Sequence, residues 1–451
     1  MAAAAARLGF LVCLLAALAP ARAGAIEDPA ANTRTTTLAN GLTVLTLEDH
    51  TTPVVSFQLW VRVGSKDEMQ YSGLAHLFEH MMFKGSEHLA PERHAQILEA
   101  RGARSNAFTS RDVTVYFADV TPEALPLVIE LEAERLAHLT IDEATLSSER
   151  EVVLEERRLR SEDNPNGLGF EALFALAFRA HPYRRPVIGW RSDVEAVDVE
   201  ACRAFFRNFY APNNIVIAVT GAFDSEDTLA RIERAFGGLP GVLPIPRNPT
   251  LEREQRGERR ETVLFDLRSP LVFAAWHTPA TGHPDAEPLD VLSSILSDGR
   301  SSRLYRRLVR EEQQALDASG GYWELQEAGL FLAWIGVRPD ASAERAERLL
   351  FEEIDRLRET RATEEELEKA KRQIEVSLLR GLRTNHALGH RIASEYVSLG
   401  RIRPLDERLE AIRRVTLEDV ERVARTYLRE DGRSVVRVVA PPAAPDAAGP
   451  S

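Results

Sequence analysis

His76-Leu77-Phe78-Glu79-His80 is the stretch that decides most about this 451-residue chain. Residues four apart on a helix lie on the same face, one turn above each other, so both imidazoles can meet one cation. Glu79 stands three residues from His76 and reaches the same space. A catalytic zinc takes three protein ligands and keeps one position open for water. The five residues therefore predict a metal site whose third ligand comes from elsewhere in the chain.

The best candidate for that ligand is Glu156, at the end of a charged helical segment that begins at Glu149. These two acids are seven residues apart, which is two helical turns, so they share a face. A single Zn²⁺ per chain, bound by His76, His80 and Glu156, leaves Glu79 free to accept a proton from bound water. For Glu149 two interpretations stay open: an acid that orients a ligand, or a plain exposed acid.

Other residues of similar type have simpler interpretations. His386 and His390 are also four apart, but no acid lies between them, so they are interpreted as solvated or structural. Cys202, within Ala201–Phe206, is expected to be a small residue in the core of a helix.

Length and composition indicate two domains of a soluble globular protein. The chain exceeds one ordinary core, and its 44% hydrophobic and 28% charged residues are typical of globular proteins. Proline and glycine crowd residues 237–249, and charge is dense over residues 252–260, which favours an exposed linker. The predicted parts are an N-terminal metal-binding domain (24–238), a linker (239–260), a C-terminal domain without a metal site (261–440) and a disordered tail (441–451).

Hydrophobic periodicity predicts the elements of the first domain. Asn40-Gly41 is a strong signal for a two-residue hairpin turn, and the alternation over Val54–Val63 favours a strand with one buried face. The remaining predicted elements are helices over Gly73–Phe83, Pro91–Ala100, Pro122–Leu139 and Asp142–Arg160, a strand-like stretch over Asn106–Val120 and a strand over Ile215–Gly221.

The second domain repeats part of the first. Leu271–Trp276 is predicted as a strand and Pro288–Leu296 as the start of a helix. When Gly299 is laid on Gly85 without gaps, Asp290, Ser293 and Ser294 fall where His76, Glu79 and His80 stand. If the domains are duplicated, only the first copy kept the metal-binding set.

The first 23 residues read as an export signal. Arg7 gives a positive charge, Leu8–Ala19 is a short apolar run, and Ala21-Arg22-Ala23 offers small residues for cleavage near Ala23. We therefore expect an exported, periplasmic protein. The apolar run is too short to span a bilayer, so no stable membrane insertion is expected. Lipidation at Cys13 is disfavoured because Val12 precedes it, and processing leaves one cysteine, too few for an internal disulfide.

The net charge bears on which kinds of partner the chain can bind. It is −13 for the whole chain and becomes −15 once the two arginines of the signal are removed, so nucleic acid is a poor partner. Simple solubility and a preference for basic peptides both remain open as reasons for the acidity.

Several segments together carry a resemblance to a known family. The sequence resembles the pitrilysin-like inverzincins, the family of mitochondrial processing peptidase and insulin-degrading enzyme, and most closely their half-length bacterial members. The matching segments are Gly73-Leu74-Ala75, the reversed motif itself, Met81–Gly85, Glu149–Glu156, His181-Pro182-Tyr183 with Gly189-Trp190, Ala211-Pro212-Asn213-Asn214, and Ser301–Tyr305.

The resemblance implies a fold. It is an α+β fold of two homologous domains, each with a mostly antiparallel or mixed sheet flanked by helices. It also implies a zinc endopeptidase that hydrolyses peptides or unfolded segments inside a chamber enclosed between two units, each about as long as this whole chain.

The resemblance also implies roles. His76 and His80 look like metal ligands, Glu156 like the acidic ligand, Glu79 like the general base and Glu149 like the supporting acid. Asn106 and Ala107 look like part of an edge strand that pairs with the substrate backbone, a mode in which an extended peptide adds to an exposed sheet edge.

One departure from the family pattern bears on assembly. The family completes its active site with an arginine and, seven residues later, a tyrosine; here Arg310 is followed by Asp317, and neither Tyr305 nor Tyr322 fits. We therefore expect a heterodimer in which a metal-free relative supplies both groups, with a homodimer as the second choice. A non-catalytic assembly subunit and a peptidase dedicated to maturing one precursor peptide remain the alternative functions.

Overall fold

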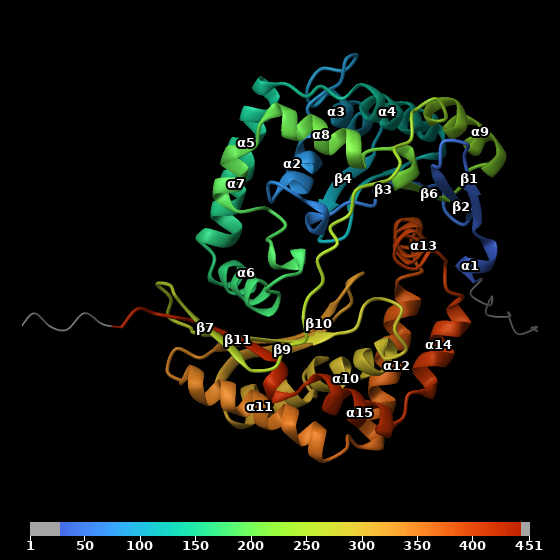
Figure 1. Cartoon of the computed structure of the whole chain (residues 1–451). Coiled ribbons are helices and arrows are strands. Elements are labelled where there is room, and N and C mark those ends of the chain that lie inside the picture. Colours follow the sequence, from blue (N-terminus) through green and yellow to red (C-terminus); the bar gives the residue numbers. More distant parts are fainter. Residues whose placement is uncertain (1–27, 443–451) are drawn as a thin grey trace, which may run out of the picture.

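The computed structural model describes residues 28–442 and shows two α+β halves stacked on each other (Figure 1). Each half contains one mixed sheet with helices packed against it. The predicted fold class is therefore confirmed. The predicted signal peptide and nearly all of the predicted tail lie outside the described residues.

The first sheet has six strands in the order β1-β2-β6-β3-β5-β4. Only β2 and β6 run parallel; the other neighbours are antiparallel. The strands are β1 (Arg34–Thr37), β2 (Thr43–Glu48), β3 (Val55–Val61), β4 (Arg104–Thr109), β5 (Thr114–Val120) and β6 (Ile215–Gly221).

The second sheet has five strands in the order β7-β11-β8-β10-β9, with β7 and β11 parallel. Laid beside the first sheet without β1, it has the same order and the same single parallel pair. This agreement supports the internal duplication predicted from the sequence. The strands are β7 (Arg259–Leu264), β8 (Leu271–Thr278), β9 (Ala315–Trp323), β10 (Gly329–Val337) and β11 (Arg433–Val439).

Helices cover both sheets, and none of those in the described part of the chain is long and apolar enough to cross a membrane. Two π-helical segments, Arg158–Glu162 and Tyr305–Glu311, accompany the α-helices. The α-helices are α1 (Pro29–Asn32), α2 (Leu74–Met81), α3 (Arg93–Glu99), α4 (Leu125–His138), α5 (Glu143–Arg157), α6 (Pro165–Ala177), α7 (Arg191–Ala196), α8 (Val199–Phe209), α9 (Ser225–Phe236), α10 (Ala286–Ser297), α11 (Ala343–Glu359), α12 (Glu364–Arg380), α13 (Asn385–Leu399), α14 (Leu405–Arg414) and α15 (Leu417–Tyr427).

The two halves exchange one helix each. Helix α6 belongs to the first half in sequence, where it follows α2 and α5, but it packs on β7, β8 and β11 of the second sheet. Helix α13 belongs to the second half but packs on β3 and β6 of the first sheet. Each sheet is thus covered by its own helices on one face and by a helix of the other half on the opposite face (Figure 1).

A glycine permits the close approach at each exchanged helix. A Cβ at Gly169 of α6 would lie 2.2 Å from the ring of Phe273 on β8. A Cβ at Gly389 of α13 would lie 2.9 Å from Nε2 of Gln58 on β3. Both crossings therefore depend on the missing side chain.

The structure corrects one sequence expectation about a strand and refines two others about local turns. The strand Val55–Val61 was expected to bury one face, but all seven residues are buried because α13 covers the second face. The hairpin turn at Asn40-Gly41 holds three residues, not two, since the N–H of Leu38 bonds to the carbonyl of Leu42 at 2.8 Å. The strand-like stretch Asn106–Val120 is two antiparallel strands, β4 and β5, joined by a turn.

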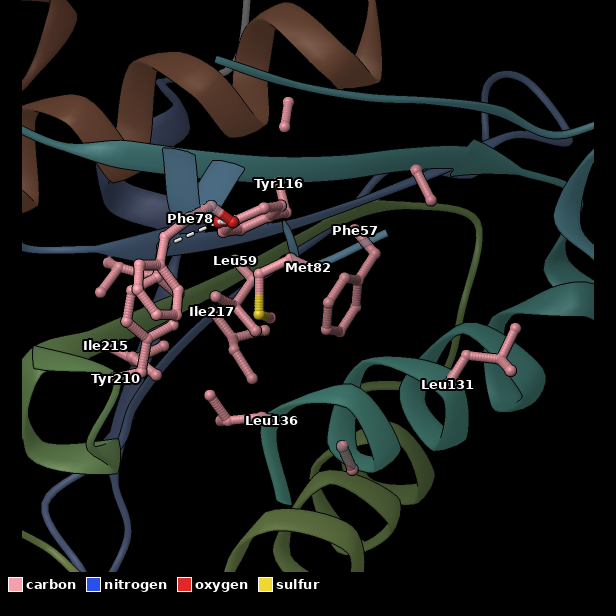
Figure 2. Close-up of a cluster of buried hydrophobic side chains, with 14 of the residues drawn as sticks. Phe57, Leu59, Phe78, Met82, Tyr116, Leu131, Leu136, Tyr210, Ile215 and Ile217 are labelled. Atoms are coloured by element: carbon pink, nitrogen blue, oxygen red, sulfur yellow. Dashed lines mark hydrogen bonds between the residues drawn. The ribbon is translucent and has the colours of Figure 1, made fainter. Parts of the chain in front are cut away.

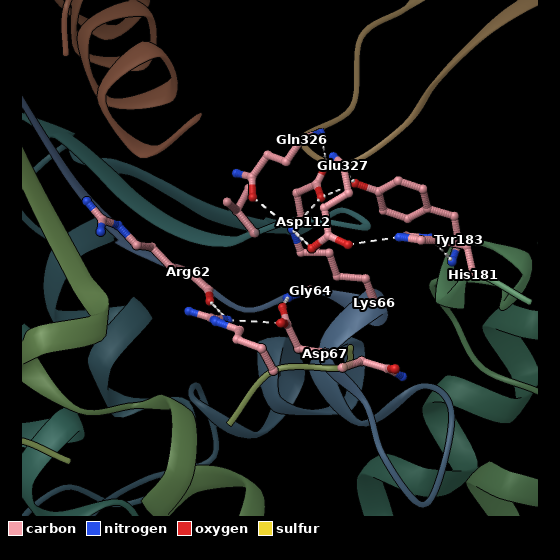
Figure 3. A network of polar contacts seen from close by, with 12 residues as sticks. Arg62, Gly64, Lys66, Asp67, Asp112, His181, Tyr183, Gln326 and Glu327 are labelled. Carbon is pink, nitrogen blue, oxygen red and sulfur yellow. Dashed lines mark hydrogen bonds and ion pairs between the residues drawn. The ribbon is translucent and has the colours of Figure 1, made fainter. Parts of the chain in front are cut away.

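A polar network that is buried on the side of the first half also joins the halves (Figure 3). The ammonium of Lys66 lies 3.0 Å from Asp112 in its own half and 3.0 Å from Glu327 on the β9–β10 connection of the second half. Glu327 also pairs with His181 at 2.8 Å. Since Nδ1 of His181 accepts the N–H of Tyr183, its Nε2 is the protonated nitrogen that donates to Glu327.

The connection between the halves runs as an extended segment, and β7 begins at Arg259, so the last two residues of the predicted linker (239–260) already belong to this strand. Most of its residues are exposed. Arg247 nevertheless anchors it to the first half, with its guanidinium 2.9 Å from Asp67 and 2.7 Å from Oδ1 of Asn214.

Candidate metal centre

The structure brings the three predicted ligands together. His76 and His80 lie on α2 with ring centroids 4.9 Å apart, and Glu156 lies near the end of α5. The Nε2 atoms of His76 and His80 are 3.8 Å and 3.3 Å from the two carboxylate oxygens of Glu156. One ligand atom from each residue lies within 4.8 Å of the other two, which is compatible with a shared metal ion.

The start of α2 is fixed by glycine and by a buried acid. Gly73 has φ of 92°, and a Cβ there would lie 2.7 Å from the carbonyl oxygen of Ile188. The carboxylate of Glu68 accepts hydrogen bonds from the N–H groups of Gly73 and Ala75, both at 2.9 Å, which satisfies two donors of the first helical turn. Burial raises the pKa of Glu68 to about 8.

The other side of α2 is held by the core (Figure 2). Phe78 is fully buried, and its carbonyl accepts a hydrogen bond from the hydroxyl of Tyr116 at 3.2 Å. Tyr116 is itself 2.8 Å from the hydroxyl of Tyr210. The two histidines and Glu79 therefore project from a helix whose opposite face is locked in place.

Glu79 extends into the same space as the two imidazoles. Its Oε2 atom is buried and has no hydrogen-bond partner in the described chain, and Thr109 of β4 lies beside it. Burial raises the pKa of Glu79. A buried carboxylate with one free oxygen beside a candidate metal is suited to accept a proton.

Glu149 lies behind His80, so the interpretation as an exposed acid is wrong. It is 1% exposed, with Oε2 3.6 Å from Nδ1 of His80 and Oε1 3.1 Å from the ammonium of Lys84. Burial opposes ionisation, but His80 and Lys84 outweigh it and lower the pKa of Glu149. A carboxylate on the far nitrogen of a candidate ligand is the usual arrangement for fixing an imidazole's orientation.

Asn106 and Ala107 lie on β4, the last strand of the first sheet, whose outer side faces no other strand in residues 28–442. Both residues line the cavity that contains the His-His-Glu cluster. The side-chain oxygen of Asn106 accepts the N–H of Ala107 at 2.9 Å. A peptide carbonyl adding along this edge would compete with the Asn106 side chain for that donor.

The cavity has a volume of about 690 Å³ and is shared by the two halves. Three aromatic side chains form part of its wall: Phe170 and Phe174 come from α6 and Trp323 from β9, and the rings of Phe170 and Trp323 stack at 6.0 Å. The second half therefore contributes directly to the site.

Sequence reasoning missed several of these side chains. Arg160, which pairs with Glu156 at 2.6 Å, is four residues further along a helical pattern, so spacing alone could have found it. Thr109 lies within the predicted strand-like stretch Asn106–Val120, but no sequence pattern indicated that it lies near Glu79. The aromatic wall depends on α6 packing across the halves, which no local pattern in the sequence reveals.

The arginine and tyrosine positions discussed above do not reach this cavity. Arg310, at the end of a π-helical segment, and Asp317, on β9, are both exposed. Neither lines the cavity, and its lining in the described part of the chain includes no tyrosine.

The equivalent helix of the second half lacks a metal-binding set. Asp290, Ser293 and Ser294 lie on α10, which packs on β9 as α2 packs on β4. Asp290 faces the guanidinium of Arg408 at 4.0 Å instead of histidines.

Comparisons with known proteins follow the same division. The family model described as insulinase, peptidase family M16, matches residues 43–190, and that described as the peptidase M16 inactive domain matches residues 196–374. An uncharacterized zinc protease of Mycobacterium bovis is 30% identical over 415 residues, covering 91% of this chain and 94% of that protein. The beta subunit of a mitochondrial-processing peptidase from Lentinula edodes is 26% identical, covering 88% and 87%.

The fold agrees with these matches. The crystal structure of a protease from Helicobacter pylori superposes with a TM-score of 0.88 at 29% identity, covering 91% of this chain and 99% of that one. The duplicated fold and the matched segments are shared with relatives named as a zinc protease and a protease. The chain belongs to the M16 peptidase family, which confirms the resemblance stated from its motifs.

Proposed function

We propose that this chain is a zinc-dependent endopeptidase. The observation that carries the proposal is the convergence of His76, His80 and Glu156 within 4.8 Å, with Glu79 beside them in a cavity bordered by an open sheet edge. Membership of a family whose relatives are named zinc proteases supports the same conclusion.

The residues present fit zinc. Two imidazole nitrogens and one carboxylate oxygen form the three-ligand set of catalytic zinc sites, and Glu79 Oε2 is left without a protein partner. A bound zinc would activate a water molecule and polarise the scissile carbonyl. Glu149 would hold the His80 ring in orientation through Nδ1.

The chain's own groups account for the remaining steps. The free edge of β4 binds the substrate as an added strand, which aligns a peptide bond with the cluster. Glu79 takes the proton from the attacking water and returns it to the departing amine. The aromatic wall formed by Phe170, Phe174 and Trp323 offers an apolar surface to one substrate side chain.

Three variants test the assignment of roles. Glu79→Gln should abolish peptide hydrolysis and keep the zinc content of wild type, whereas His76→Ala and Glu156→Ala should lose hydrolysis and one zinc per chain relative to wild type. Zinc is measured by elemental analysis on the same samples used for hydrolysis. Unchanged zinc at the cluster in His76→Ala would contradict the ligand assignment.

We also infer a partner. The cavity lining of the described chain contains no tyrosine, and one relative is by name a subunit of a processing peptidase. A metal-free relative that adds an arginine and a tyrosine would complete the site, with a second copy of this chain as the other candidate. Purifying the native exported complex identifies which protein accompanies the chain. If the single chain alone were as active as the complex, the inference of a partner would be wrong.

Two narrower points remain proposals. The predicted export is tested by the N-terminal sequence of the native protein, which should begin near Gly24.

The alternative function is that of a non-catalytic assembly subunit. The match of residues 196–374 to a domain described as inactive favours this alternative. If the wild-type protein hydrolyses peptides and the Glu79→Gln variant does not, the non-catalytic role is excluded.

A further inference from the structure

Within residues 28–442, a second group of side chains has metal-ligand chemistry and plays no part in the proposed catalysis. His88, Glu134 and His138 each offer a ligand atom within 4.8 Å of the other two. Glu134 and His138 are four residues apart on α4, so they share one face. His88 reaches that face from the loop between α2 and α3.

The backbone fixes the loop against the helix end. Ser86 and Leu139 form an isolated antiparallel bridge, and the N–H of Glu87 donates to the carbonyl of His138 at 2.9 Å. The positions from which the three side chains project are therefore set before any ligand binds, which lowers the entropy cost of binding.

The side chains are also oriented toward one another. One oxygen of Glu134 accepts the hydroxyl of Ser86 at 2.7 Å and lies 3.0 Å from Nδ1 of His88. The ring centroids of His88 and His138 are 5.2 Å apart, close to the 4.9 Å between His76 and His80. Glu87 adds a carboxylate 3.3 Å from Nδ1 of His138.

An ordinary surface ion pair explains only part of this arrangement. It accounts for His88 and Glu134, and such pairs contribute little to stability. Ion pairs, including the one between His138 and Glu87, do not require the two imidazole rings to lie edge to face at 5.2 Å with the Glu134 carboxylate within ligand distance of both. A divalent cation shared by both rings and the carboxylate satisfies all three. Both histidines are largely exposed, which leaves space for water as further ligands.

We propose that His88, Glu134 and His138 form a second site for a divalent transition metal, separate from the His76 site. Two imidazoles and one carboxylate suit Zn²⁺, and also Ni²⁺ or Cu²⁺, better than Ca²⁺ or Mg²⁺. The bound ion would tie the loop after α2 to the end of α4 and so stabilise the folded chain by mass action.

The test uses the full chain stripped of metal and re-equilibrated with Zn²⁺, followed by measurement of zinc per chain. Wild type should bind two, and the double variant His88→Gln/His138→Gln should bind one and retain peptidase activity. His50→Gln is the matched control, since His50 is an exposed histidine 3.2 Å from Glu48 and belongs to no three-ligand group. It should still bind two.

A second variant, His76→Gln/His80→Gln, removes the first site and so reports on the second site alone. It should bind one zinc per chain. Replacing His88 and His138 as well should abolish this remaining zinc binding. Titration of Ni²⁺ into this variant should show at least a tenfold loss of affinity on replacing His88 and His138. Equal zinc content and equal Ni²⁺ affinity with and without these two histidines would overturn the second site, whatever the outcome at the first.

Discussion

At the scale of single residues, the site depends on carboxylates whose surroundings give them different tasks. Glu156 faces both imidazoles, Glu79 has a free buried oxygen, and Glu149 stands behind His80. The sequence identified all three acids, because a helix fixes which residues share a face. It did not decide whether Glu149 was exposed, since that depends on Lys84 and the packing of α2 against α5.

Glu149 supplies a prediction at this scale. Glu149→Gln should weaken zinc binding by about 10- to 100-fold, because His80 loses the charged partner that orients it. Competition against a chromophoric chelator measures the affinity. Glu151→Gln, an exposed acid on the same helix, is the control and should bind zinc like wild type. Equal affinities in both variants would assign Glu149 no part in holding His80.

At the scale of elements, the helices and strands that local patterns predicted lie near their observed bounds, with β6 matched residue for residue, but most helices of the second half were not predicted. They did not predict which sheet a helix covers. The exchange of α6 and α13 arises from long-range packing, so no local pattern indicates that β3 is buried on both faces. The aromatic wall was missed for the same reason.

The exchange makes a prediction about stability. Gly169→Val should destabilise the chain by about 1–3 kcal/mol, because the added side chain collides with the buried ring of Phe273. Urea unfolding measures the change. A Cβ at Gly238 meets no atom within 4 Å, so Gly238→Val should lie near wild type. A Gly169→Val protein as stable as this control would show that α6 does not pack as described.

At the scale of the whole molecule, the halves are joined by polar contacts that respond to pH. The hydrogen bond from His181, together with Lys66, lowers the pKa of Glu327 to about 2, below the ordinary value of 4.5 for a glutamate. A depressed carboxyl pKa adds stability that is complete above the unfolded pKa and disappears as the pH falls through the folded one.

The stability advantage of wild type over Glu327→Gln should therefore be largest above pH 4.5 and shrink between pH 4.5 and 2. Urea unfolding across this range measures it. Asp340→Asn is the control, because Asp340 is an exposed residue whose ion-pair partner, Arg338, lies two residues away in the same half. A difference between wild type and Glu327→Gln that stays constant over the range would contradict the assigned role of Glu327.

The most direct test of the central claim compares wild type with Glu79→Gln, each purified within the native complex so that any partner groups are present. Zinc content and hydrolysis of an unstructured peptide are measured on the same samples. The proposed function predicts equal zinc content and a rate at least about 100-fold lower for Glu79→Gln, the scale of a lost general base. Hydrolysis by Glu79→Gln at the wild-type rate would contradict the role of Glu79 and, with it, the proposed peptidase site.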